Sequence, residues 1–459
     1  MFRSVPRFSI AVSALSLAAL GGCAFDDYRE LPLDPDAILA ELEARRTPTR
    51  LDTPVTLAEA TTWLERGPNV QAALSDLEVA RARAAITTPL PNPSIEIGYD
   101  YALDGGTPDQ RGVPLGGIGF AIPLGDRRAC RDALRRLELE RARVGAVTRL
   151  REEWLALRTM FLDAGVAERY EFALADAEQT AATAVGLAER LVEAGRSSAD
   201  RVAAFELELA RARAARGAFE SERTRLHTDL AIRTGTSLGD WPGVAPPDVV
   251  DIVATPEPVV LRDALVANNP ELARLRADHA IAEGRLRLAI AEQYPDLRIG
   301  PSVGGEIGET RTVVGLSLGI ELPLFDRNQL EIATARAERS RCALLYERYL
   351  NRALTELEGA VARLRLAIEQ LRIQRERVGP IARRAFDLAR RAIDAGRADT
   401  MDLLLAAQSA RRANLEQLTA LRALHAAWGE LERITGTPLL RIEGSTMPSV
   451  ELRNQETSR

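Results

Sequence analysis

Histidine and cysteine, with three residues each, are the rarest of the side chains here that could supply nucleophiles, proton carriers or metal ligands. His227, His279 and His425 are far apart in the sequence and each lies in a helical pattern, so packing or surface roles are the simpler interpretation. Cys130 and Cys342 have no second cysteine or histidine at metal-ligand spacing. A disulfide between these two cysteines stays open. The sequence therefore indicates neither a catalytic residue nor a metal site.

Motifs that carry enzyme chemistry are missing from the sequence. It contains no H-E-x-x-H and no G-x-S-x-G, and the glycines at 116–119 belong to a strand pattern and do not open a phosphate-binding helix. All 60 basic residues are arginine, which excludes a Walker-type lysine and Schiff-base chemistry. We expect no enzyme and no cofactor, and an exported hydrolase is the weakest alternative.

The N-terminus has the pattern of an export signal. Two arginines precede an apolar run at residues 8–20, which is too short for a transmembrane helix. The run ends on Leu-Gly-Gly-Cys at residues 20–23, which resembles the lipobox of bacterial lipoproteins. This resemblance implies that Cys23 is acylated, and Ala24 after it implies passage to the outer membrane. An ordinary signal peptide with an incidental cysteine is the alternative.

Charge and hydropathy exclude further classes of protein. After the signal, no stretch reaches the roughly 20 apolar residues of a membrane-spanning helix, so any membrane crossing falls to β-strands. The formal net charge of the whole chain is −6. A negative charge is the wrong sign for a protein that binds nucleic acid, so we expect no such partner.

The chain is written twice, with a shift of about 200 residues, which is the signature of an internal repeat. Short strings recur in the same order in both copies, and two of them share an offset of 201 residues. The recurring pairs are residues 122–127 and 322–327, 194–196 and 395–397, and 234–236 and 435–437.

Each copy reads as a helix, a strand pair, a very long helix and a further helix. Apolar and small residues alternate three and four apart along residues 150–191, with one slip of phase, and along 346–395, which is the heptad pattern of a coiled coil. Gln374 interrupts the second pattern. A helix over 126–190 would be about 100 Å long. Within the first copy, we expect two further helices, over 57–87 and 200–234, to flank this long helix.

Four segments with a period of two lie between the helices. They cover residues 94–101, 117–122, 297–307 and 312–322, and lengths near 10 residues suit a transmembrane strand. Four strands leave two unpaired edges, which a bilayer does not tolerate. Three chains would close twelve strands into a barrel, with the glycines at 105–106 in an outward loop.

Residues 57–436 resemble the TolC-type outer-membrane efflux protein family, and three local motifs carry this resemblance. These are Asn-Asn-Pro-Glu-Leu at 268–272, Leu-Pro-Leu-Phe-Asp-Arg-Asn-Gln at 322–329, and the stretch 379–402, in which Pro380 implies a local kink. The second motif is most similar to the heavy-metal branch, CzcC- or CusC-like. The cargo implied is therefore metal ions ahead of drugs.

The resemblance implies a mainly α fold with a small β part: a long coiled-coil helical barrel and four transmembrane strands per protomer, closing as a trimeric 12-stranded barrel. It also implies a lipid-anchored homotrimer in the Gram-negative outer membrane, in contact with its lipid. The protein would passively conduct cargo from an inner-membrane pump and a periplasmic adaptor protein. Type I secretion or drug efflux is an alternative, and a trimeric coiled-coil scaffold lipoprotein is the non-transport alternative.

The same resemblance assigns roles to the two interhelical turns. It implies that they contact the adaptor through Arg190, Leu191, Gly195, Ser198, Gly396 and Arg397. The glycines would take the left-handed conformation that ends a helix. Asp402 and Asp399 would gate the channel by attracting cations. The alternative is that both aspartates only stabilise a helix N-terminus, and Leu405 replaces a second acidic position of the family.

We expect the following organisation along the chain: a lipoprotein signal peptide at 1–22, a lipid-anchored linker at 23–54, a first repeat at 55–238, an inter-repeat linker at 239–258, a second repeat at 259–439 and a polar tail at 440–459.

Overall fold

The computed structural model describes residues 28–45, 54–101, 112–195, 198–237, 243–245, 256–305, 312–395, 400–440, 442 and 447. The chain divides into two compact units, residues 1–47 and 48–459. In the first unit, the exposed helix α2 (Pro35–Arg45) lies within the predicted linker. Cys23 and the predicted signal peptide lie outside the described residues.

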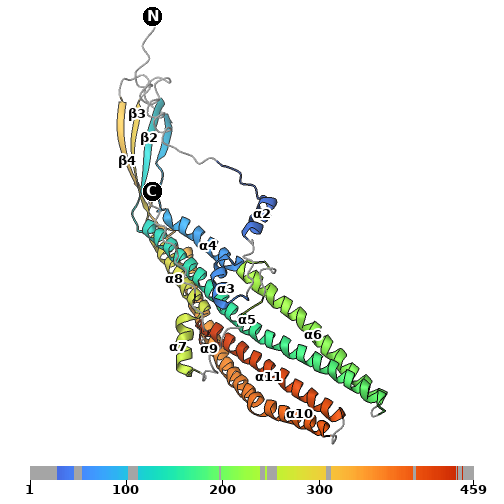
Figure 1. Ribbon diagram of the computed structural model, residues 1–459. Helices are drawn as coiled ribbons and strands as arrows, with labels where there is room; N and C mark the ends of the chain where they lie inside the picture. The colour runs from blue at the N-terminus through green and yellow to red at the C-terminus, as the bar shows by residue number, and fades with distance from the viewer. Residues whose placement is uncertain are drawn as a thin grey trace. The chain divides into compact units, whose positions relative to one another are not determined.

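The second unit contains the repeat that the sequence predicts (Figure 1). Its first copy holds α3 (Leu57–Trp63), α4 (Pro68–Ala85), β1 (Ser94–Tyr101), β2 (Gly112–Pro123), α5 (Arg127–Glu193) and α6 (Ala199–Thr234). Its second copy holds α7 (Pro258–Asn268), α8 (Pro270–Ala291), β3 (Asp296–Gly305), β4 (Thr312–Ile320), α9 (Gln329–Ile373), α10 (Gly379–Asp394) and α11 (Thr400–Thr435).

The four strands form one antiparallel sheet in the order β1-β2-β3-β4, so β1 and β4 are its edges. Every second residue of a strand points to the same face. One face carries apolar rows, such as Ile122, Leu297 and Ile320 in register. The other face carries small and polar residues, such as Gly300 opposite Ser317. The sheet is therefore apolar on one side only.

The long helix α5 organises the rest of this unit. It has 67 residues, which gives a length of about 100 Å. It packs against α6 and α11, and also against α4 and α8, while α10 packs against α11. Figure 1 shows α5 with α6 and α10 with α11 as two helical hairpins. The predicted long coiled-coil helix is confirmed, and it ends three residues later than predicted.

Two predicted helices are interrupted. The segment 57–87 is not one helix, because Gly67 separates α3 and a 3₁₀ turn from α4. A Cβ atom at Gly67 would lie 2.1 Å from the carbonyl oxygen of Arg233, so only glycine fits this close approach. Pro68 then starts α4, where its missing N–H costs no hydrogen bond.

In the second copy, the heptad break expected at Gln374 is a π-helical segment, Gln374–Val378, between α9 and α10. The Gly379 N–H donates to the Gln374 carbonyl, five residues back. This wider turn precedes Pro380, which cannot donate a helical hydrogen bond. The local disturbance expected at Pro380 therefore takes the form of a π-helical turn.

The main apolar core lies where α5, α9 and α11 meet, around Trp154, Phe161 and Trp428, which are 1%, 0% and 1% exposed. Leu440 and Ile442 are also buried in it. The chain that follows α11 therefore still covers the core, within the segment predicted as the start of the polar tail.

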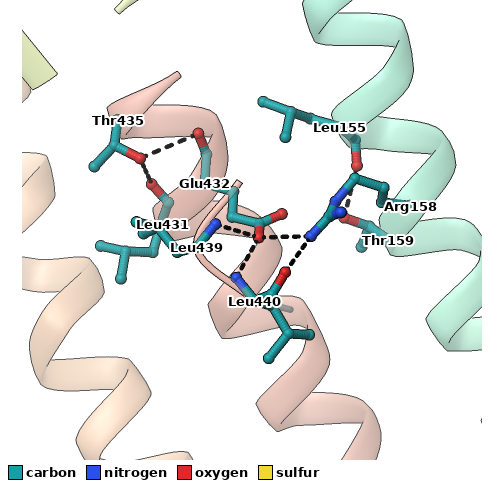
Figure 2. A network of polar contacts seen from close by, with 8 residues as sticks. All are labelled: Leu155, Arg158, Thr159, Leu431, Glu432, Thr435, Leu439 and Leu440. Atoms are coloured by element: carbon teal, nitrogen blue, oxygen red, sulfur yellow. Dashed lines mark hydrogen bonds and ion pairs between the residues drawn. The ribbon is translucent and has the colours of Figure 1, made fainter. Parts of the chain in front are cut away.

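A buried ion pair crosses this core. Arg158 of α5 donates from Nη2 to the Glu432 carboxylate of α11 (3.1 Å) and to the Leu440 carbonyl (2.6 Å). The same carboxylate accepts from the backbone N–H groups of Leu439 and Leu440 (Figure 2). The guanidinium also lies 4.9 Å from the Trp154 ring. The network joins α5 to the chain that leaves α11.

Candidate functional site

The first interhelical turn connects α5 to α6 as the sequence predicts. Gly195 has a φ of 65°, and its N–H donates to the Val192 carbonyl (2.9 Å). Arg190 is exposed, and its Nε donates to the Gly186 carbonyl of its own helix (3.0 Å). Ser198 is exposed and directly precedes α6. The turn thus presents a positive and a polar residue to solvent.

The second interhelical turn connects α10 to α11. Gly396, Arg397 and Asp399 lie outside the described residues, and nothing is described of the Leu191 side chain. Asp402 is exposed in the first turn of α11. That position satisfies the helix-terminus interpretation and also leaves the carboxylate accessible to a passing ion.

A polar cluster that the sequence did not reveal joins the two hairpins above these turns. The side chain of Glu208 on α6 is 8% exposed, and its Oε1 lies 2.5 Å from Arg411 Nη2 on α11. Gln408 of α11 donates to the other carboxylate oxygen (3.1 Å). Arg211 is 3.9 Å away on the same helix as the glutamate. The cluster ties α6 to α11.

A signal for this cluster was present in the sequence. Phe205, Glu208 and Ala212 are spaced three and four apart, and all three are buried on α6. A glutamate in an apolar heptad seam requires a partner when the seam is buried. The partner could not be read, because Arg411 lies about 200 residues away.

An apolar seam of α6 has no partner within the described chain. Ala203, Leu207, Ala210 and Ala214 follow a heptad spacing, and all are exposed. At the repeat offset of 201 they correspond to Leu404, Gln408, Arg411 and Leu415 of α11, which are buried or half-buried. On α10, Ile381, Ala385 and Leu388 are likewise exposed. Within the chain, α11 packs against α5. The helices that correspond to them in the other copy, α6 and α10, expose the equivalent apolar surfaces.

The histidines are packing residues in the described structure. His425 of α11 is 5% exposed, and burial lowers its pKa to about 4. Burial also lowers the pKa of the half-buried His227. His279 is half-buried on α8. Cys130 and Cys342 are free thiols. Among the described residues, no group of three His, Cys, Asp or Glu side chains is placed to hold a metal ion.

None of the helices that the structure describes is both long and apolar enough to span a membrane. The exposed apolar residues of the sheet include Ile95, Ile97 and Tyr99 on edge strand β1, and Leu316 and Leu318 on edge strand β4. One face of the sheet and both of its edges therefore lack partners in the described chain.

A one-sided sheet joined to long helical hairpins is the fold of an outer-membrane channel subunit, as solved structures show. The outer-membrane channel OprN has a TM-score of 0.68 and 18% identity, covering 90% of this chain and 98% of that one. CusC has a TM-score of 0.67 and 15% identity, covering 90% of this chain and 99% of that one. VceC from Vibrio cholerae has a TM-score of 0.66 and 15% identity, covering 83% of this chain and 96% of that one. A search of the curated proteins finds no match.

Residues 261–437 match the family model of the outer membrane efflux protein, which assigns the second repeat to that family. The family resemblance seen in the sequence motifs is thereby confirmed. The expected fold class, helical hairpins with a small four-stranded sheet, is also confirmed. Family and fold are those of channel proteins, not of enzymes. OprN and CusC are matched about equally well, so the fold does not select the heavy-metal branch.

Proposed function

We propose that this chain is the outer-membrane subunit of a tripartite efflux system, three copies of which form a passive duct. The observation that carries the proposal is the unfilled seam on α6 and α10. Because α11 covers α5 within the chain, the repeat requires α6 of a second copy to cover α10. A contact that passes from one copy to the next generates a ring when the rotation between copies closes, and we propose closure after three copies.

The sheet requires the same neighbours. Its edge strands β1 and β4 present backbone N–H and C=O groups that must be paired inside a membrane. Joining β4 of one copy to β1 of the next satisfies both edges. Three copies close a sheet of twelve strands, with the apolar rows toward lipid and the glycines and serines toward the lumen.

The interhelical turns are the proposed adaptor-docking tip, formed by Arg190, Leu191, Gly195, Ser198, Gly396 and Arg397. The exposure of Arg190 and Ser198 supports this role for the first turn. Asp402, with Asp399, is the proposed gate. Three symmetry-related copies of an exposed carboxylate would form a ring that attracts cations at the narrow end of the duct.

Acylation of Cys23 would anchor the chain to the outer membrane, and residues 23–54 would connect the anchor to the first repeat at 55–238. The second repeat would span 259–439. The proposed cargo is heavy-metal ions, on the strength of the string at 322–329. Drug efflux or type I secretion is the alternative. The absence of a buried metal cluster among the described residues is compatible with loose, transient cargo contact.

Single-channel conductance of the purified full-length protein in a planar bilayer tests the duct. We expect stepwise conductance from the trimeric fraction and none from the monomeric fraction. A non-conducting trimer, in the wild type and in a variant with a weakened contact between the two hairpins such as Glu208→Gln, would favour the coiled-coil scaffold lipoprotein.

A further inference from the structure

A cavity of about 770 Å³ lies between the two hairpins. It is lined by α5, α6, α10 and α11, between the π-helical segment and the interhelical turns. Figure 1 shows these four helices as two hairpins, α5 with α6 and α10 with α11. Pockets that hold drug-sized ligands have volumes of roughly 300–1,000 Å³. The cavity is therefore large enough for a small organic molecule.

Small residues keep this space open. Five alanines of α5, at 173, 177, 181, 184 and 188, line the cavity along one side of the helix. Gly379 lines its end near the π-helical segment, where a Cβ atom would lie 3.5 Å from both Arg383 Nη2 and Gln417 Oε1. Phe205 and Phe386 add aromatic surface from α6 and α10. The lining thus offers an apolar floor with aromatic sides.

The charged side chains of the lining do not cancel. Arg411 is paired with Glu208, so its charge is already compensated. Arg383 and Arg390 of α10 also line the cavity, and neither has an ion-pair partner among the described residues. Asp176 is the remaining carboxylate of the lining. One positive charge is therefore left over beside the apolar floor.

We propose that this cavity is a binding site for an amphiphilic organic anion of drug size. Its apolar body would lie on the alanine floor against Phe205 and Phe386. Its carboxylate or sulfonate would face the guanidinium groups of Arg383 and Arg390, which recognise planar anions through paired hydrogen bonds. The proposal rests on the lining of the cavity within one chain, so it does not depend on transport.

The chain provides a matched control for the charge argument. Arg384 and Arg391 follow the two lining arginines by one residue on the same helix, are equally exposed, and do not line the cavity. The double variants R383Q/R390Q and R384Q/R391Q therefore remove the same charge from α10. All four side chains are exposed in the single chain, so neither variant removes a core contact within it.

The experiment measures binding of dansylglycine, an aromatic carboxylate, to the full-length protein in lipid nanodiscs by fluorescence. Neutral dansylamide is the control for apolar binding. We expect saturable dansylglycine binding that weakens at least fivefold in R383Q/R390Q and less than twofold in R384Q/R391Q. Ala184→Leu, which fills the floor, should weaken both probes.

Three results would overturn the proposal. The first is absence of saturable dansylglycine binding to the wild type. The second is an equal loss of affinity in the two double arginine variants, which would indicate attraction to the charge of α10 as a whole. The third is binding of dansylamide as tight as that of dansylglycine, which would assign the cavity to uncharged molecules.

Discussion

Glu208 of α6 and Arg411 of α11 form an ion pair of 2.5 Å between two hairpins of the same chain. At the repeat offset, Arg411 corresponds to Ala210 and Gln408 corresponds to Leu207, both exposed and apolar or small. The chain therefore closes one contact between hairpins with a buried carboxylate, whereas the counterparts of its partners Arg411 and Gln408 carry no polar side chain. Since a polar contact is lost when either partner changes, the contact between α6 and α11 is open to a direct test.

A double-mutant cycle measures this ion pair. Glu208→Gln and Arg411→Gln should each destabilise the protein, and the double variant should lose less than the sum, with a coupling energy of about 1–3 kcal/mol. Arg211→Gln is the control, because Arg211 is 3.9 Å from the carboxylate and its side chain is 65% exposed. Thermal denaturation of the full-length protein gives all four values. Additive single effects would exclude the coupling.

Removal of the buried carboxylate at Glu432 should be more costly. Glu432→Ala leaves the 2%-exposed Arg158 side chain without its counter-charge, which typically costs about 3–5 kcal/mol. Glu430→Ala, two residues earlier on α11, removes a surface ion pair with Arg363 and should cost less than about 1 kcal/mol. Chemical denaturation compares the two variants, and equal losses would contradict the role of burial.

Periodicity in the sequence was sufficient to predict the elements of the repeat. The strand at 94–101 and the heptad break at Gln374 were placed correctly, because each reflects a local pattern of side chains. The strand at 117–122 was predicted too short, since β2 begins at Gly112 with glycine and proline residues that obscure the alternation. Local pattern thus gives the type of an element more reliably than its ends.

Contacts between distant residues could not be predicted. The helix break at Gly67 depends on the close approach of Arg233, and the Glu208 cluster depends on a helix of the other repeat. A third example is the cavity, whose lining combines five alanines of α5 with two arginines of α10. Each of these features requires the relative placement of helices that the sequence pattern leaves undetermined.

Burial of His425 predicts a dependence of stability on pH. Desolvation lowers its pKa from 6.5 to about 4, and the positive charge of Arg169 adds to this, whereas a hydrogen bond to the Leu162 backbone opposes it. As the pH falls, His425 is therefore protonated near pH 6.5 in the unfolded chain but only near pH 4 in the folded chain. This contribution to stability is present above pH 6.5 and is lost progressively as the pH falls toward 4, by up to about 3 kcal/mol.

The difference between wild type and His425→Gln isolates this contribution from the carboxylates that titrate in the same range. Melting temperatures measured between pH 7.5 and 4.5 should fall more steeply for the wild type than for the variant. Parallel curves for the two proteins would exclude His425 as the source.

Substitution of Asp402 distinguishes its proposed role in the gate from a role in stabilising the helix terminus. Asp402→Asn should lower the preference of the channel for cations in asymmetric salt, because a ring of three carboxylates would lose its charge. Asp200→Asn is the control, since Asp200 is the acidic residue of the first turn of α6. Both variants lose a favourable helix-dipole interaction of about 0.3–1 kcal/mol. A similar loss of cation preference in both variants would remove the special role of Asp402.

Cysteine cross-linking tests whether α6 of one copy covers α10 of the next. Ala184 packs against the apolar cluster that contains Leu404, and at the repeat offset these two residues correspond to Ala385 and Ala203. Cysteines at Ala203 and Ala385, in a chain whose Cys130 and Cys342 are replaced by serine, should therefore form bonds between copies. Because the ring closes after three copies, the largest covalent species on a denaturing gel should be a trimer.

Pairing Ala203→Cys with Leu330→Cys provides the control, since Leu330 is 75% exposed but lies at the start of α9, at the end that is far from α10. This pair should give only monomers. A ladder that extends beyond the trimer would show that the contact is propagated without closure, as in an open filament. Monomers alone from the Ala203 and Ala385 pair would mean that these seams are covered by something other than another copy of the chain.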